Sequence, residues 1–213
     1  MNLKDLSQAV INGDEELAIK YVNEALQAGT SAVTIYREGL IPGMNVVGEK
    51  MQSGEYFIPE VLISVEVMRK AHEVLKLIMS HSEARNIAGR VIIGTVQGDL
   101  HDIGKNLVIA MLEGSGFEVI DLGVDITPDK FVNTVRDVKP DILGLSALLS
   151  VTMLNMKSVI DALEKADLRN QVKVIVGGAP VSKEFADEIR ADGYAPDAGS
   201  ATLLAKKIVA GRQ

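Results

Sequence analysis

The spacing of hydrophobic positions changes partway along the chain and separates two regions. In residues 1–88 apolar residues recur at intervals of three and four, which is typical of amphipathic helices. This pattern predicts four helices joined by short loops, which would form a small bundle. Pro42 and Gly43 fall inside the third helix, expected at about 32–51, so we expect a kink or a break there.

The second region, residues 89–213, has short β-rich apolar runs that alternate with helical segments. This alternation predicts a mostly parallel sheet with helices on both faces. Five strands favour the doubly wound, flavodoxin-like order 2-1-3-4-5. The expected strands are 90–96, 117–122, 141–147, 172–176 and a weak fifth at 193–195, and the expected helices are 104–114, 128–138, 152–166, 182–190 and 200–210.

The polar stretch at about 80–89 is expected to link the two regions. The predicted fold class is therefore α plus α/β, with a helical-bundle cap domain at 1–88 and a flavodoxin-like or Rossmann-like domain at 89–213. His72 and His81, which flank the end of the bundle, are expected at the surface.

Composition narrows the function classes. A net charge of −7 argues against a protein that binds the phosphate backbone of nucleic acids, and the lack of tryptophan leaves few stacking surfaces for bases. The chain has no cysteine, which excludes disulfides and thiolate metal sites. No run approaches the roughly 18 to 20 apolar residues of a membrane span, and the first residues lack a signal-peptide pattern. We therefore expect a cytoplasmic protein without nucleic-acid or membrane partners.

The candidate chemistry is concentrated in the turn after the first expected strand. In a doubly wound sheet, such a turn lies where ligands bind. Histidine is a common metal ligand, and it binds best when its second ring nitrogen donates to a carboxylate. Asp99 is the candidate for that carboxylate, and the glycines allow a sharp turn and a close ligand. The turn reads Gly98-Asp99-Leu100-His101-Asp102-Ile103-Gly104.

Asp99-x-His101-x-x-Gly104 resembles the cobalamin-binding signature of corrinoid methyl carriers and of cobalamin-dependent methionine synthase. A lone motif of this length is weak, but the resemblance extends through an ordered set that covers nearly the whole chain. The further segments are 43–48, 57–61, 121–124, 144–148, 177–180 and 192–198.

The resemblance implies a cobalamin or related corrinoid cofactor, which alternates between methylcobalamin and cob(I)alamin. His101 would replace the cofactor's own base as the lower axial ligand of cobalt. Asp99 would hydrogen-bond the imidazole, and Thr152 would supply the hydroxyl that completes the relay, at a position where the synthase has serine. A solvent-facing loop histidine is the alternative interpretation of His101.

The resemblance also implies a wider set of cofactor-binding residues. In the sheet domain they are Gly98, Asp99, Leu100, His101, Asp102, Ile103, Gly104, Ser146, Leu148, Ser150, Gly177, Gly178 and Ala198. In the bundle, Met51, Ile58 and Val61 would cover the methyl-bearing face. Taken singly, the serines and glycines also suit ordinary turns, and the three bundle residues also suit a bundle core.

A carrier of this kind would receive its methyl group from a substrate-specific methyltransferase. It would pass the group to a corrinoid:tetrahydrofolate or corrinoid:thiol methyltransferase. A reductive activase would restore the active state of the carrier. The bundle would move aside for each partner, with a hinge at about 80–89. The methyl donor is not encoded in this chain.

Two alternatives remain open at this point. One is a cobalamin-binding sensor that regulates a partner. The other is an HD-type metal phosphohydrolase, because the stretch from Leu100 to Lys105 also matches that signature. Those enzymes are all-helical and need several further histidines, whereas this chain has 3 in total.

Overall fold

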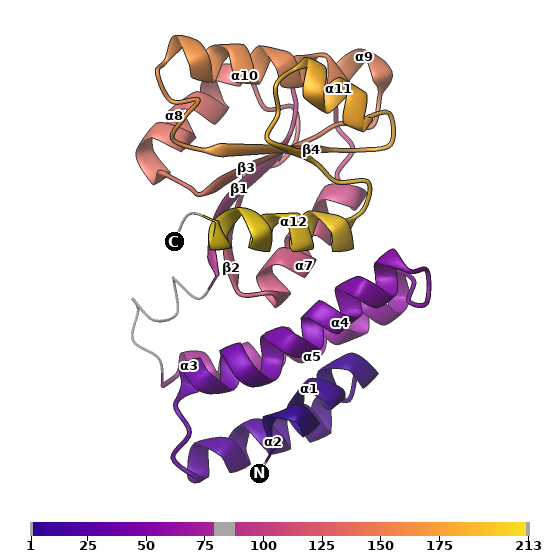
Figure 1. Ribbon diagram of the computed structural model, residues 1–213, viewed down its shortest axis with the longest axis vertical. Coiled ribbons are helices and arrows are strands. Elements are labelled where there is room, and N and C mark those ends of the chain that lie inside the picture. Colours follow the sequence, from indigo (N-terminus) through magenta and orange to yellow (C-terminus); the bar gives the residue numbers. More distant parts are fainter. Residues whose placement is uncertain (1, 79–87, 212–213) are drawn as a thin grey trace. The chain divides into compact units, whose positions relative to one another are not determined.

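The computed structural model describes residues 2–78 and 88–211 of the chain (Figure 1). Contacts divide it into two compact units, one of 1–88 with 110–117 and one of 89–109 with 118–213. Most of the expected linker at 80–89 lies outside the described residues, as does His81. The domain boundary at residue 88 and the hinge therefore stay predictions.

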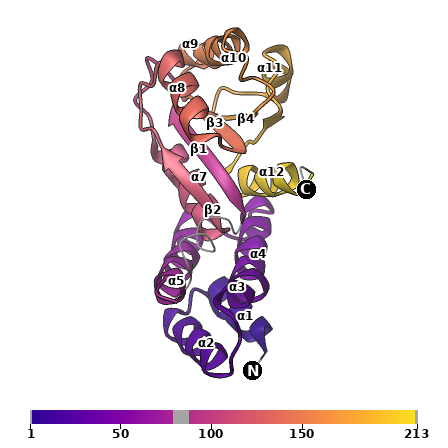
Figure 2. The same ribbon diagram turned by 90° about the vertical axis from the view of Figure 1, so that its left-hand side faces the viewer.

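The N-terminal helices form the predicted bundle. The first helix packs against the second, the third and the last, and the second packs against the last (Figure 2). Side chains of Asn2, Asp14 and Ser31 accept from backbone amides at three of the helix starts. The elements are α1 (Leu3–Asn12), α2 (Glu15–Gln27), a third helix made of α3 (Ala32–Thr34), η1 (Ile35–Leu40) and α4 (Ile41–Gln52), and α5 (Ile58–Lys76).

The third helix is irregular where Pro42 and Gly43 predicted disruption, but it does not break. Residues Ile35–Leu40 form a π-helix, in which the amide of Ile41 donates to the carbonyl of Tyr36, five positions earlier. Pro42 follows in the first turn of α4. Because proline lacks an amide hydrogen and its ring crowds the carbonyl four positions earlier, a wider turn accommodates it.

His72 on α5 corrects one expectation. Its side chain is partly buried, its ring lies edge-on to Tyr36 with centroids 5.5 Å apart, and its Nδ1 is buried without a hydrogen-bond partner in the described part of the chain. It is therefore half-buried, with its ring packed beside Tyr36, and not fully at the surface as expected.

The second unit has the predicted five-stranded sheet, in the order β2-β1-β3-β4-β5. The pairs β1–β3, β3–β4 and β4–β5 are parallel. Each strand agrees with its predicted range to within one residue at either end, so the flavodoxin-like prediction is confirmed. The strands are β1 (Gly89–Thr95), β2 (Phe117–Asp121), β3 (Ile142–Ser146), β4 (Lys173–Gly177) and β5 (Gly193–Tyr194).

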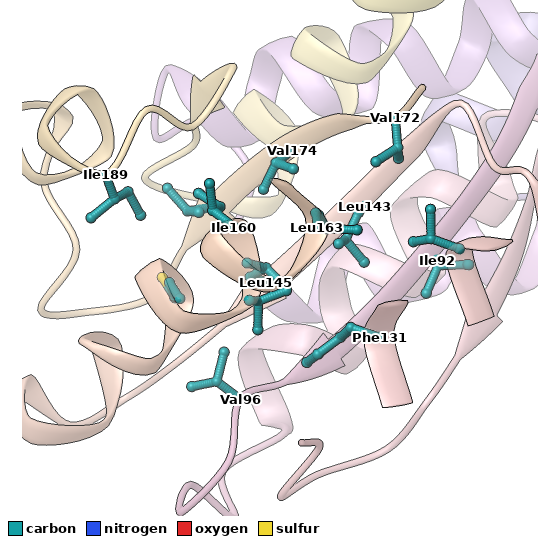
Figure 3. Packing of buried hydrophobic residues seen from close by; sticks show 14 of the residues in the cluster. Ile92, Val96, Phe131, Leu143, Leu145, Ile160, Leu163, Val172, Val174 and Ile189 are labelled. Atoms are coloured by element: carbon teal, nitrogen blue, oxygen red, sulfur yellow. The ribbon is translucent and has the colours of Figure 1, made fainter. Parts of the chain in front are cut away.

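Helices cover both faces of this sheet. Apolar side chains of α8, α10 and α11 pack with those of β1, β3 and β4 in one core, which includes Phe131, Leu143 and Ile160 (Figure 3). On the opposite face lies α12 (Figure 1), whose Leu204 fills the space beside Gly193. The helix expected at 152–166 begins earlier and is divided near Leu154. The helices are α7 (Ile103–Gly114), α8 (Pro128–Val138), α9 (Ser150–Met153), α10 (Asn155–Lys165), α11 (Lys183–Glu188) and α12 (Ala198–Ala210).

Within residues 2–78 and 88–211, none of the helices combines the length and apolarity that a bilayer crossing requires.

Candidate functional site

The sheet brings three of the predicted loops to one edge. Thr95 at the end of β1 pairs with Ser146 at the end of β3, and Ser146 pairs with Gly177 at the end of β4. The amide of Val96 donates to the carbonyl of Ser146 at 3.0 Å. The loops that leave these strands therefore begin side by side at the carboxyl edge, where doubly wound sheets bind ligands.

The carboxylate of Asp99 is the centre of this edge and is completely buried. Its Oδ1 accepts from Nδ1 of His101 at 2.8 Å and from the His101 amide at 3.1 Å. Its Oδ2 accepts from the amides of Leu148 at 2.8 Å and Leu149 at 3.2 Å, and from the hydroxyl of Thr152 at 2.5 Å. The expected contacts of Asp99 with His101 and with Thr152 are thus present.

These hydrogen bonds define the charge of Asp99. Burial by itself raises the pKa of the Asp99 carboxyl, but the bonds donated by Thr152, Leu148 and His101 outweigh burial and hold that pKa well below its ordinary range. An ionised carboxylate only accepts hydrogen bonds, so Nδ1 of His101 must carry the proton. In the neutral imidazole the lone pair is then on Nε2, and the His101 side chain is 50% exposed. His101 is therefore prepared to bind a metal through Nε2.

Thr95 holds the backbone of His101 from the other side. Its buried hydroxyl donates to the His101 carbonyl at 2.9 Å. The peptide groups on both sides of His101, as well as its ring, are thus fixed by hydrogen bonds. We did not predict this residue, and its only sequence signal is a hydroxyl at the end of an apolar strand.

Apolar side chains are exposed beside this imidazole. Leu100 is 71% exposed, Ile103 is 83% exposed and Leu148 is 44% exposed, and all three belong to the predicted site. Soluble proteins rarely expose several large apolar side chains together unless they bind something. Three further exposed residues of this kind were not predicted, although they follow β3 directly in the sequence: Leu149, Val151 and Leu154.

The predicted glycines differ in what they accommodate. Gly178 has φ +136°, and a Cβ there would lie 1.8 Å from the carbonyl oxygen of Ala147. Gly98 has φ +83°, and at Gly177 a Cβ would lie 3.0 Å from the carbonyl oxygen of Ala195. Around Gly104, in contrast, no atom lies within 4 Å of the Cβ position. Space beside the start of α7 is therefore open, whereas the glycines at β4 are required by packing.

The remaining predicted residues of this unit lie at element starts. Asp102 is partly buried, and its carbonyl accepts from the amide of Asn106 at 2.7 Å in the first turn of α7. Ser150 is exposed at the start of α9, and Ala198 is buried at the start of α12.

The three predicted residues of the bundle have different surroundings. Ile58 is exposed at the start of α5, and Met51 is partly buried near the end of α4. Val61 is completely buried in one row with Ser64 and Met68 of the same helix. Packing in the bundle core is sufficient to explain a valine at position 61. Its burial gives no support to the expected place near a methyl group.

Comparison with known proteins agrees with the geometry. Residues 89–203 match the family model of the B12 binding domain, and residues 3–76 match a second model of the same description. The fold and the site thus define a B12-binding protein, and its cofactor is cobalamin or a related corrinoid. Within that class, the chain belongs to the corrinoid proteins of methyltransferase systems, as its relatives show.

The relatives match along nearly their whole length. A corrinoid protein of Desulfitobacterium hafniense is 42% identical over 212 residues, which is 97% of both chains. Trimethylamine corrinoid protein 1 of Methanosarcina acetivorans is 43% identical over 202 residues, with 94% of this chain and 92% of that protein covered.

Two solved structures have the same fold. A cobalamin-binding protein from Desulfitobacterium hafniense superposes with a TM-score of 0.86 at 35% identity, with 98% of this chain and 99% of that chain covered. A methanol:cobalamin methyltransferase complex from Methanosarcina barkeri gives a TM-score of 0.83 at 30% identity, with 98% and 80% covered.

The phosphohydrolase alternative is wrong. Its signature requires an all-helical fold, whereas His101 follows a strand of a parallel sheet. Within the described parts of the chain, no three histidine, aspartate or glutamate side chains are grouped so that they would hold a metal ion.

Proposed function

We propose that this protein carries a methyl group on the cobalt of its bound corrinoid, with His101 as the lower axial ligand. The observation that carries this proposal is the Asp99–His101 hydrogen bond of 2.8 Å, which orients a half-exposed imidazole among exposed apolar side chains. His101 would hold the cobalt of a corrinoid through Nε2, and the apolar side chains would lie against the ring around the metal.

The chain's own residues have distinct tasks in this proposal. When bound, the corrinoid supplies a cobalt ion that accepts and releases the methyl group. Asp99 keeps the proton on Nδ1 of His101 and turns Nε2 outward, and Thr152 and two backbone amides keep Asp99 in place. Leu100, Ile103 and Leu148 exclude water from the site.

The nucleotide tail of the cofactor would enter the sheet domain beside Gly104, where the structure has open space. Ser146, Ser150, Gly177, Gly178 and Ala198 would line its path. In the bundle, Ile58 and Met51 are the residues that we assign to the cover of the methyl-bearing face, since Val61 is buried in the core.

The proposed partners follow from the carrier role. A substrate-specific methyltransferase would load the protein, a corrinoid:tetrahydrofolate or corrinoid:thiol methyltransferase would unload it, and a reductive activase would repair it. Relatives are named for trimethylamine and dimethylamine, and one structural neighbour is a methanol methyltransferase complex. Methylamines and methanol are therefore the first donors to test.

The decisive experiment is reconstitution with cobalamin, followed by visible and electron paramagnetic resonance spectra. The wild type should show a histidine nitrogen on cobalt in place of the cofactor's own base, and His101→Ala should lose it. His72→Phe removes a histidine of the bundle and should retain the ligation. A wild type that binds cobalamin with its own base still attached would contradict the assignment of His101. Tight binding without methyl transfer from any donor and methyltransferase would favour the sensor alternative.

A further inference from the structure

The loop that carries His101 is held at both ends by one segment of the chain. We call residues Gly98–Lys105 the ligand loop and residues Asp121–Asp125, which connect β2 to α8, the brace. The brace follows β2, the edge strand next to β1, so the topology places it beside the ligand loop. The roles assigned above to the corrinoid site do not include any residue of the brace.

Asp125 holds the first end of the ligand loop. Its Oδ1 accepts from the amide of Gly98 at 2.7 Å, and its own amide donates to the carbonyl of Asp99 at 3.0 Å. Asp125 has φ +56°, a backbone conformation that costs energy for most residues but that aspartate tolerates. Two consecutive residues, Gly98 and Asp99, which lie three and two positions before His101, are therefore held by the side chain and the backbone of one residue.

Lys105 holds the second end. Its side chain is 1% exposed, and its ammonium donates to both carboxylate oxygens of Asp121 at 2.8 Å and to Oδ1 of Asn106 at 2.8 Å. A buried ammonium is costly unless it is paired, so this geometry is strongly specified. Asp121 also accepts from the amide of Gly123 at 2.8 Å, which fixes the shape of the brace.

The middle of the brace reaches His101 through one residue. The amide of Thr95 donates to the carbonyl of Gly123 at 3.0 Å, and the Thr95 hydroxyl donates to the carbonyl of His101. The brace thus acts on the ligand loop at Gly98, at His101 and at Lys105. These three points restrict how the loop can shift along the sheet edge.

From these contacts, we infer that Asp125 and the Lys105–Asp121 ion pair are positioning residues for the binding of cobalt by His101. This inference rests on the proposed function, because it holds that the brace determines how accurately Nε2 of His101 is placed for binding the metal. A loop released at either end would still contain His101 and Asp99, but the imidazole would meet cobalt in a smaller fraction of the molecules. Ligation and cofactor affinity should then fall together.

The test compares four substitutions in the full chain. Asp125→Gly removes the acceptor while it relieves the positive φ, and Asp125→Asn keeps an oxygen that accepts from Gly98. Asp167→Gly is the matched control, since Asp167 also has φ +56° but lies between α10 and β4, at the opposite edge of the sheet. Lys105→Met releases the other end of the loop; the side chain of its partner Asp121 is already 40% exposed, so that water can solvate the carboxylate left behind.

Each variant is loaded with cobalamin and reduced to the Co(II) state. The measured quantities are the dissociation constant for cobalamin, the fraction of cobalt with nitrogen hyperfine coupling from histidine, and the urea unfolding of the cofactor-free protein. Asp125→Gly and Lys105→Met should weaken binding about threefold to tenfold, as expected for the removal of a hydrogen bond, and should lower the histidine-bound fraction. Asp125→Asn and Asp167→Gly should match the wild type in that fraction.

The outcomes separate the two proposals. An Asp125→Gly protein that folds and binds cobalt through histidine as completely as the wild type overturns the brace and leaves the carrier function intact. A wild type without histidine on cobalt overturns the proposed function and the brace with it. If Lys105→Met does not fold, Asp125→Gly alone decides.

Discussion

The hydroxyl of Thr152 lies 2.5 Å from Oδ2 of Asp99. The two residues come from different segments. Asp99 lies in the loop after β1, and Thr152 lies in α9, which follows β3. Because the same carboxylate accepts from His101, the bond joins both loops to the imidazole. The position of the proposed metal ligand therefore depends on a contact between distant parts of the sequence.

Thr152→Val tests that contact, since it removes the hydroxyl and keeps the shape of the side chain. We expect the free energy of unfolding of the cofactor-free protein to fall by about 1–2 kcal/mol, because a buried carboxylate loses one charge-assisted donor while its amide donors remain. Thr152→Ser keeps the donor and should lose less. Urea unfolding at neutral pH measures both, and equal losses for valine and serine would refute a role for the hydroxyl.

Gly104→Ala separates stability from cofactor binding. No atom lies within 4 Å of the Cβ position, and Gly104 is in the first turn of α7, so the free energy of unfolding should stay equal or rise by up to about 1 kcal/mol. If the nucleotide tail passes here, cobalamin affinity should fall at least about tenfold, since an added methyl group in a filled channel is worth more than about 1.4 kcal/mol. Gly178→Ala is the contrasting variant. It should destabilise the protein by about 3 kcal/mol or more, because its Cβ would meet the carbonyl of Ala147 at 1.8 Å. An unchanged affinity of Gly104→Ala for cobalamin would show that the nucleotide tail does not pass beside Gly104.

The exposed apolar side chains of the ligand loop make a second separation possible. Ile103 is 83% exposed and Leu77, at the end of α5, is 87% exposed. Serine at either position should change the free energy of unfolding by less than about 0.5 kcal/mol. Ile103→Ser should also weaken cobalamin binding about threefold to tenfold, because an apolar side chain no longer covers the cofactor there, whereas Leu77→Ser should not. Titration of both proteins with cobalamin measures these affinities. Equal affinities for cobalamin would show that Ile103 is not part of the binding site.

The sheet was predictable because its strands are short apolar runs between turn residues, and the parallel order follows from strand–helix alternation. The π-helix was not, since Pro42 signals only that a regular helix is disrupted and not how the backbone responds. The division near Leu154 of the helix expected at 152–166 was likewise not predictable, because no glycine or proline stands there.

The site was predictable only where its partners are close in sequence or part of a known motif. Asp99 and His101 are two positions apart, so their contact follows from the local turn. Thr95 and Asp125 reach the same loop through strand pairing and crossover connections, which a one-dimensional pattern does not reveal. Among the side chains of the brace that hold the loop, Asp121 alone had a signal, because it belongs to the resembling segment 121–124, to which no role was assigned.

His72 makes the stability of the bundle depend on pH. Burial lowers the pKa of the His72 imidazole, Lys76 lowers it further, and Glu73 opposes this only in part. The unfolded chain, with an ordinary pKa of about 6.5, therefore binds a proton at higher pH than the folded one. The contribution of neutral His72 is complete above that value, and it is lost as the pH falls through it toward the lower folded pKa.

The measurement is the free energy of unfolding of wild type and His72→Phe between pH 8 and pH 5, both without cofactor. Phenylalanine keeps an aromatic ring against Tyr36 but does not titrate, so the wild type should lose stability relative to the variant as the pH falls, by about 1.4 kcal/mol for each pH unit between the folded and unfolded pKa values. Lys76→Gln in the wild-type background should reduce this difference without abolishing it, because burial remains the larger cause. Parallel curves for wild type and His72→Phe would show that the buried Nδ1 has a partner or access to water in solution, and that protonation of His72 does not oppose folding.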